Sequence, residues 1–165
     1  MGNTMKTFLV GLETGATGLL ALAAALLTVS ESVLRYVAPM RLPDWGAEVT
    51  VYLVGWAVML SASRLIRDRM HVGVDMLVER QSPRAQVALR LFSCVFGVIV
   101  SGFIAYAGWL MVDFAVMLGE RSDSSIRFPM WGYYAAIPVG FVLCAATYLW
   151  QIVEIATGRG PAAEV

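Results

Sequence analysis

The residues of this sequence that could do chemistry are few and widely spaced. His71 is the only histidine, and Cys94 and Cys144 stand in apolar runs with no further cysteine or histidine at metal-ligand spacing. One imidazole excludes bis-histidine haem ligation and leaves no second imidazole for a zinc or di-iron site. We interpret the two thiols as packing groups and His71 as a loop residue that bonds backbone. The sequence therefore predicts no metal and no cofactor.

Charged residues within or near the apolar runs are the other chemical groups. Glu13 and Arg64 stand near run ends, where a long side chain can reach toward water, and Glu31 precedes Arg35 by four residues, the favourable order for a helical ion pair. Asp113 lies deeper without a local partner, so we expect it to pair across helices or to face the outer aqueous edge. Neither a Ser/His/Asp set, nor paired carboxylates, nor a glycine-rich phosphate loop can be assembled. The sequence therefore predicts no enzyme.

The elements that carry these residues are almost entirely apolar. Hydrophobic residues make up 59% of the 165 positions and charged residues only 15%, which is unlike a soluble domain of this length. A bilayer core about 30 Å thick requires roughly 20 apolar residues per helix, and four stretches qualify, at about 12–34, 48–66, 88–112 and 131–153. We therefore predict an all-α integral membrane protein with a single membrane domain over 1–165. The first run continues well past Lys6, which favours a membrane anchor over a cleaved signal peptide.

The distribution of basic residues predicts the orientation of the four helices. Six arginines lie in the connection between the second and third helices, and Lys6 and Arg159 bring that group to eight, against four in the other two connections. Basic residues near helix ends mark the cytoplasmic side, so we predict an N-in, C-in topology. The net charge is zero and Lys6 is the only lysine, which argues against nucleic-acid binding.

Three local patterns refine this layout. The alternation of apolar and charged residues over 72–80, including Asp75, predicts a short interfacial segment between the second and third helices. Ser82-Pro83 predicts an early start for the third helix, and Pro129 predicts the start of the fourth. Pro138 falls inside the fourth helix and predicts a kink.

Small residues and tryptophans predict helix faces. Ser93, Gly97, Ser101 and Ala105 recur at four-residue spacing on the third helix and predict a close helix contact, within the chain or to a partner. Trp45, Trp131 and Trp150 are placed at the membrane boundaries. Trp56 and Trp109 lie deeper and are expected to face protein.

Three stretches together resemble the small membrane subunit, DctQ-like, of the tripartite ATP-independent periplasmic (TRAP) transporters. They are Val33-Leu34-Arg35-Tyr36 with Leu42-Pro43, Trp45 and Glu48; Arg64 with His71-Val72 and Val74-Asp75; and Ser125-Ile126, Phe128-Pro129-Met130-Trp131, Tyr134 and Ile137-Pro138-Val139-Gly140-Phe141. The similarity covers roughly 30–145 in the family's order. One departure is Met59-Leu60-Ser61-Ala62, where many members carry a glycine.

The resemblance implies a multi-pass protein of the bacterial inner membrane without a substrate site of its own. Such a subunit braces a large, DctM-like membrane subunit and helps to dock a periplasmic substrate-binding protein during sodium-coupled uptake of an organic acid. Two alternatives remain open: a self-contained small transporter or channel, which would need a polar path, and a membrane anchor of a redox complex, which would need axial ligands.

Two sets of residues are predicted to carry these contacts, in a chain surrounded by membrane lipid. The interface or structural set comprises Arg35, Tyr36, Trp45, Glu48, Arg64, His71, Asp75, Ser93, Gly97, Ser101, Ala105, Asp113, Pro129, Trp131, Pro138 and Gly140. The periplasmic docking set comprises Arg41, Asp44, Glu120, Arg121, Asp123 and Arg127.

Overall fold

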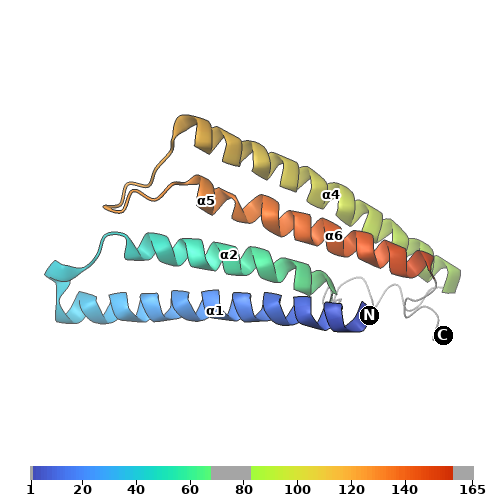
Figure 1. The fold of residues 1–165 in the computed structure, drawn as a ribbon, viewed down its shortest axis with the longest axis horizontal. Helices are drawn as coiled ribbons and strands as arrows, with labels where there is room; N and C mark the ends of the chain where they lie inside the picture. The colour runs from blue at the N-terminus through green and yellow to red at the C-terminus, as the bar shows by residue number, and fades with distance from the viewer. Residues whose placement is uncertain (1, 68–82, 158–165) are drawn as a thin grey trace.

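The computed structural model describes residues 2–67 and 83–157, with the side chains of 11, 13–66 and 85–157 (Figure 1). These residues form helices and short connections, in the order α1 (Gly2–Val37), η1 (Pro39–Arg41), α2 (Gly46–Arg67), α4 (Pro83–Leu118), α5 (Trp131–Tyr134) and α6 (Ala136–Ala156). Four segments are long and apolar enough to cross a membrane: Glu13–Val37, Gly46–Ile66, Ala85–Leu118 and Trp131–Ala156. The predicted all-α membrane fold is confirmed. The predicted interfacial segment, His71 and Asp75 lie outside the described residues.

Helix α4 is longer than its predicted apolar span, which was placed at 88–112. It ends at Leu118, where Gly119 takes a positive φ of 59°. The amide of Gly119 donates to the carbonyl of Val116, and that of Glu120 donates to the carbonyl of Ala115. This is the Schellman pattern, for which glycine is suited because it adopts the left-handed conformation without strain. Asp113 is therefore a residue of the helix itself and is followed by more than one further turn.

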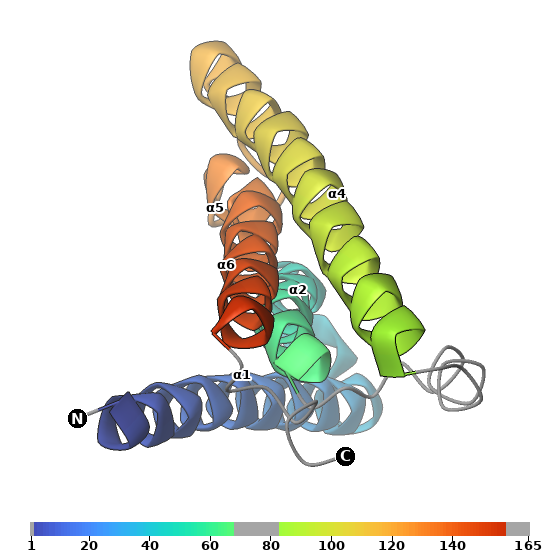
Figure 2. The ribbon, with the colours of Figure 1, turned by 90° about the vertical axis from the view of Figure 1, so that its right-hand side faces the viewer.

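The four long helices lie side by side as an open array rather than a closed bundle. Helix α1 packs against α2, α2 against α6, and α6 against α4. Figures 1 and 2 show α1 and α4 at opposite edges of this array, with α2 and α6 between them. Since an edge helix meets a neighbour on one side only, most of its apolar surface stays uncovered. On α1, for example, Leu19, Leu22 and Leu26 are all exposed.

Close approaches at glycines set the spacing of the central helices. A Cβ on Gly140 of α6 would lie 2.8 Å from the Cβ and 2.9 Å from the carbonyl oxygen of Met59 on α2. A Cβ on Gly97 of α4 would lie 2.7 Å from the ring of Tyr148 on α6. In both places the missing side chain lets two helices approach more closely than an alanine would allow.

The fourth membrane segment is interrupted three residues before Pro138, where a kink is predicted. The α-helical pattern breaks at Ala135, between α5 and α6. Proline has no amide hydrogen, so the carbonyl of Tyr134, four residues earlier, receives no bond from position 138. The ladder resumes with the amide of Val139, which donates to the carbonyl of Ala135 at 3.2 Å. The fourth segment begins at Trp131, two residues after Pro129.

Both ends of the described chain lie at one end of the array, together with the ends of α2 and α4 that flank 68–82 (Figure 1). We call this the terminus end. The opposite end carries η1 and the connection 119–130, and we call it the hairpin end. This arrangement is what an N-in, C-in topology requires. Which end faces the cytoplasm stays a prediction from the arginine distribution.

Candidate functional site

The connection 119–130 at the hairpin end is a short antiparallel hairpin. Arg121 and Pro129 form a bridge, the amide of Ser122 donates to the carbonyl of Phe128 at 2.9 Å, and the amide of Met130 donates to the carbonyl of Glu120 at 3.1 Å. Because its backbone groups pair with one another, the hairpin has a defined shape instead of extending freely into water. It can therefore present a fixed surface.

Two carboxylates at the start of α2 hold this hairpin. Glu48 accepts hydrogen bonds from the hydroxyls of Tyr52, on its own helix, and of Ser122, the latter at 2.6 Å. Asp44 accepts from the hydroxyl of Ser125 at 2.7 Å and from the amide of Ser125 at 2.9 Å. The hydroxyl and the amide of Ser125 together hold the pKa of Asp44 below its ordinary value, because both favour the charged form. We refer to Asp44, Glu48, Ser122 and Ser125 as the hairpin latch.

An aromatic group continues the latch into the array. The ring of Tyr52 stacks on Tyr133 with centroids 5.0 Å apart and lies 5.5 Å from the ring of Phe128. The hydroxyl oxygen of Tyr52 also lies 3.1 Å from the sulfur of Met130. Trp56, one turn further along α2, donates its indole N–H to the carbonyl of Gly132 at 3.1 Å. The expectation that Trp56 faces protein is confirmed, and this contact joins α2 to α5.

The predicted docking residues all lie at the hairpin end. Asp44 belongs to the latch and is exposed, and the other five are exposed as well: Arg41, Glu120, Arg121, Asp123 and Arg127. Arg127 takes a positive φ of 50° in the turn of the hairpin. The sequence reasoning missed Ser122 and Ser125, the hydroxyl donors of the latch. Only the spacing of Glu48 and Tyr52, four residues apart on one helix, could have pointed to this cluster.

The terminus end carries a second set of polar contacts between helices. Glu13 of α1 accepts a hydrogen bond from the buried hydroxyl of Ser63 on α2, and Arg64 donates to the hydroxyl of Thr14 at 2.9 Å. Polar groups within the membrane boundary thus meet partners on the neighbouring helix, which lowers the cost of placing them there.

Gln151 joins three helices at the same end. Its amide nitrogen donates to the carbonyl of Ile66 on α2 at 3.1 Å, and its amide oxygen accepts from the thiol of Cys94 on α4 at 3.4 Å. Both cysteines are buried and unbridged, as packing groups would be. Among the described residues, no group of three or more His, Cys, Asp or Glu side chains is placed to hold a metal ion.

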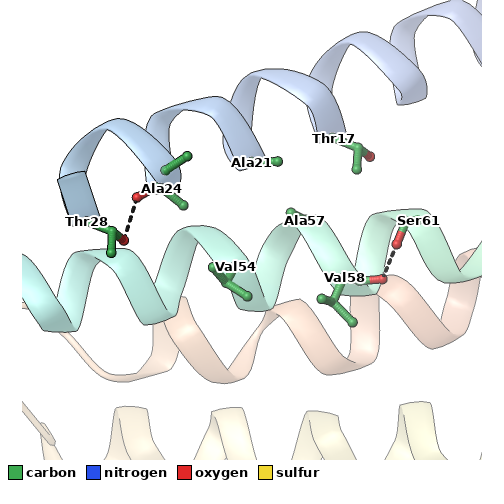
Figure 3. A pocket seen from close by; sticks show the side chains of 9 residues that line it. Thr17, Ala21, Ala24, Thr28, Val54, Ala57, Val58 and Ser61 are labelled. Carbon is green, nitrogen blue, oxygen red and sulfur yellow. Dashed lines mark hydrogen bonds between the residues drawn. The ribbon is translucent and has the colours of Figure 1, made fainter.

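A shallow groove of about 420 Å³ runs between α1 and α2 (Figure 3). Its walls are small or β-branched side chains, among them Ala21 and Ala24 of α1 and Val54 and Ala57 of α2. The hydroxyl oxygen of Thr17 is enclosed at one end of the groove and makes no hydrogen bond with any described residue. The groove is apolar and open, so it offers space for another apolar chain and lacks the convergent polar groups of a small-molecule site.

The small residues of α4 are used within the chain. Ser101 and Ala105 are buried, Gly97 lies under the ring of Tyr148, and Ser93 at the end of the row is exposed. The four-residue row thus faces α6, which leaves the opposite side of α4 uncovered. Trp109 is 62% exposed, so it does not face another described part of this chain, and the expectation that it faces protein stays a prediction for a partner.

The remaining predicted residues fall into two classes. Pro138 and Gly140 are buried between helices, whereas Arg35, Tyr36 and Trp131 are exposed near the hairpin end, and Trp45 is half-buried there.

The predicted ion pair of Glu31 with Arg35 is wrong, because within the described part of the chain neither residue makes an ion pair. The Glu31 carboxylate lies instead against Gly46 at the start of α2. A carboxylate is favourable there because the first amides of a helix carry partial positive charge.

Comparison with known proteins gives a consistent result. The family model described as tripartite ATP-independent periplasmic transporters, DctQ component, matches residues 24–158. A "C4-dicarboxylate TRAP transporter small permease protein DctQ" from Rhodobacter capsulatus is 29% identical over 107 residues, which are 64% of this chain and 46% of that protein. A protein of the same description from Pseudomonas aeruginosa is 25% identical over 95% of this chain and 73% of its own length. Another from Vibrio cholerae is 27% identical over 83% of this chain and 68% of its own length.

Proposed function

Because this chain belongs to the DctQ component family of the tripartite ATP-independent periplasmic transporters, we propose that it braces a large, DctM-like membrane subunit through its helix faces. The chain is a multi-pass membrane protein and a transporter subunit. We infer that it has no catalytic activity and no substrate site of its own, and that it resides in the bacterial inner membrane with its hairpin end on the periplasmic side.

The observation that carries this proposal is the open array. Both edge helices, α1 and α4, pack on one neighbour each and leave long apolar faces uncovered. In lipid, helices associate through close packing and polar contacts and not through expulsion of water. A broad open array of helix faces supplies such contacts along the side of a larger protein. A self-contained channel would instead require its helices to surround a polar path.

The hairpin supports a second part of the proposal, docking of a periplasmic substrate-binding protein. The latch holds 119–130 in one shape, and charged side chains of both signs stand on and beside it, including Arg41, Arg121 and Asp123. Mixed charges on a fixed surface favour a specific orientation of an incoming protein and speed its encounter. For the whole transporter we propose sodium-coupled uptake of an organic acid. The relatives described as C4-dicarboxylate transporters support a carboxylate substrate.

Co-purification with transport measurements tests the proposal. The tagged chain, expressed with the large subunit of its transporter, should retain that subunit in mild detergent, and cells that lack only this chain should lose uptake. Undiminished uptake in those cells would contradict an obligatory bracing role. Solute flux through the chain reconstituted alone would support the channel alternative, and a haem spectrum in the purified chain would support the redox alternative.

A further inference from the structure

Among the α4 residues whose side chains are described, 85–118, the side that faces away from α6 carries one charged residue inside an apolar surface. Asp113 is exposed, and the residues three and four positions before and after it on the helix are Trp109, Leu110, Val116 and Met117. All four are exposed and apolar. Residues at these spacings are the ones a helical side chain can reach. The helix itself therefore offers Asp113 no charged neighbour, and the indole N–H of Trp109 makes no hydrogen bond with it.

No other part of the described chain compensates this carboxylate. Asp113 makes no hydrogen bond and no ion pair with any residue in 2–67 or 83–157. The helices that pack on α4, namely α6 and α5, contact it through its buried side, where Ser101, Ala105 and Ala115 lie. The carboxylate stands on the opposite side, as the helical spacing requires.

The surroundings also argue against a position in open water. Met117 and Leu118 lie beyond Asp113 toward the hairpin end and are 79% and 63% exposed, so the apolar surface continues past the carboxylate. Three other charged residues of the spans behave differently, since Glu13, Glu48 and Arg64 meet partners on another element. A carboxylate within an apolar helix face is stabilised when an opposite charge reaches it.

We propose that the face of α4 around Asp113 docks against a helix of the large membrane subunit that carries an arginine or lysine at the depth of Asp113. This inference rests on the proposed function, and it assigns the contact face and the chemistry of the partner residue. The aromatic and aliphatic side chains on both sides of Asp113 pack against that helix and exclude lipid and water. In this low-dielectric setting the pair fixes the register of the two helices along the membrane normal.

Two substitutions at one position test the pairing in the assembled transporter. Asp113→Leu removes the charge and suits a lipid-exposed face, and Asp113→Arg reverses it. We expect each to lower the amount of large subunit that co-purifies by about tenfold, with this chain still present in the membrane at its normal level. The matched control is Glu154→Gln on α6, which removes a charge away from the Asp113 face, keeps an acceptor for the indole N–H of Trp150, and should leave retention unchanged.

A charge exchange completes the test. With Asp113→Arg in place, each membrane-embedded arginine or lysine of the large subunit is changed in turn to aspartate, and one such change should restore retention and uptake. Loss of retention that no exchange restores would overturn ionic pairing. If both Asp113 variants retain as much large subunit as the wild-type chain, the inference about Asp113 is overturned and the proposed function still stands. A wild-type chain that retains no large subunit would overturn the proposed function as well.

Discussion

The central helices and the edge helices of this array use their surfaces differently. α2 and α6 pack on both sides, and their polar groups, such as Glu48, Trp56 and Gln151, bond to neighbouring elements. α4 packs on one side, and its other side exposes Phe103, Tyr106 and the unpaired Asp113. Since a polar group within a membrane needs a partner, the contrast separates residues that hold this chain together from residues available to another protein.

Gly140→Leu should give the largest effect on the centre of the array. A side chain at this position meets the backbone of Met59, so the α2–α6 contact must open, at a cost of about 3 kcal/mol. The matched control is Gly102→Leu on α4, where nothing lies within 4 Å of an added Cβ. Thermal unfolding in detergent measures both. If the two substitutions destabilise the protein equally, close packing does not distinguish the central helices from the edge helix α4.

Glu48→Ala tests the hairpin latch. The hydroxyls of Ser122 and Tyr52 lose their shared acceptor, which should destabilise the hairpin end by about 1–2 kcal/mol. Limited proteolysis within 119–130 should become faster, and the unfolding temperature should fall. The control is Glu120→Ala, an exposed carboxylate of the same loop. Unchanged proteolysis in Glu48→Ala would show that the hairpin is held by its aromatic contacts instead.

Gln151→Leu should have a smaller effect at the terminus end. It removes the bonds to the Ile66 carbonyl and the Cys94 thiol while keeping a side chain of similar size. Hydrogen bonds between membrane helices contribute about 0.6 kcal/mol on average, so a small fall in unfolding temperature is expected. Thr147→Val, which removes a hydroxyl bonded to its own helix, serves as the comparison. If both variants lower the unfolding temperature by the same amount, the hydrogen bonds of Gln151 do not stabilise the contacts between helices.

Acidification should give the smallest effect, confined to the latch. The folded pKa of Asp44 is lowered, so its bonds to Ser125 stabilise the hairpin above the ordinary carboxyl pKa and are lost as the pH falls through the lowered value. Proteolysis within 119–130 should therefore accelerate only in that acidic window. Asp44→Asn should remove the part of this pH dependence that comes from residue 44, because an amide does not titrate. An equal acceleration in the variant would assign the pH response to another group.

The sequence by itself determined the elements and the family. Run length and hydropathy predicted the four membrane helices, because a bilayer sets the length of an apolar span. Pro138 predicted a kink in the fourth span, and the helical pattern breaks at Ala135, three residues before it. The end of α4 was missed at Leu118, although Gly119 was a local signal for it. The succession of short motifs over roughly 30–145 identified the family, which the match over 24–158 confirms.

Only the tertiary structure decided which face of each helix packs against another helix of the same chain. In a lipid environment nearly every side of a helix is apolar, so hydrophobic periodicity does not point toward a core, and it does not say whether Trp109 faces its own chain or a partner. The small-residue row on α4 allowed a contact inside or outside the chain, and the ring of Tyr148 against Gly97 settles it as inside. The partners of Glu48 and Glu13 lie on segments 74 and 50 residues away, a pairing that local spacing does not encode. Asp113 stands out as unpaired only after those other polar groups have been assigned.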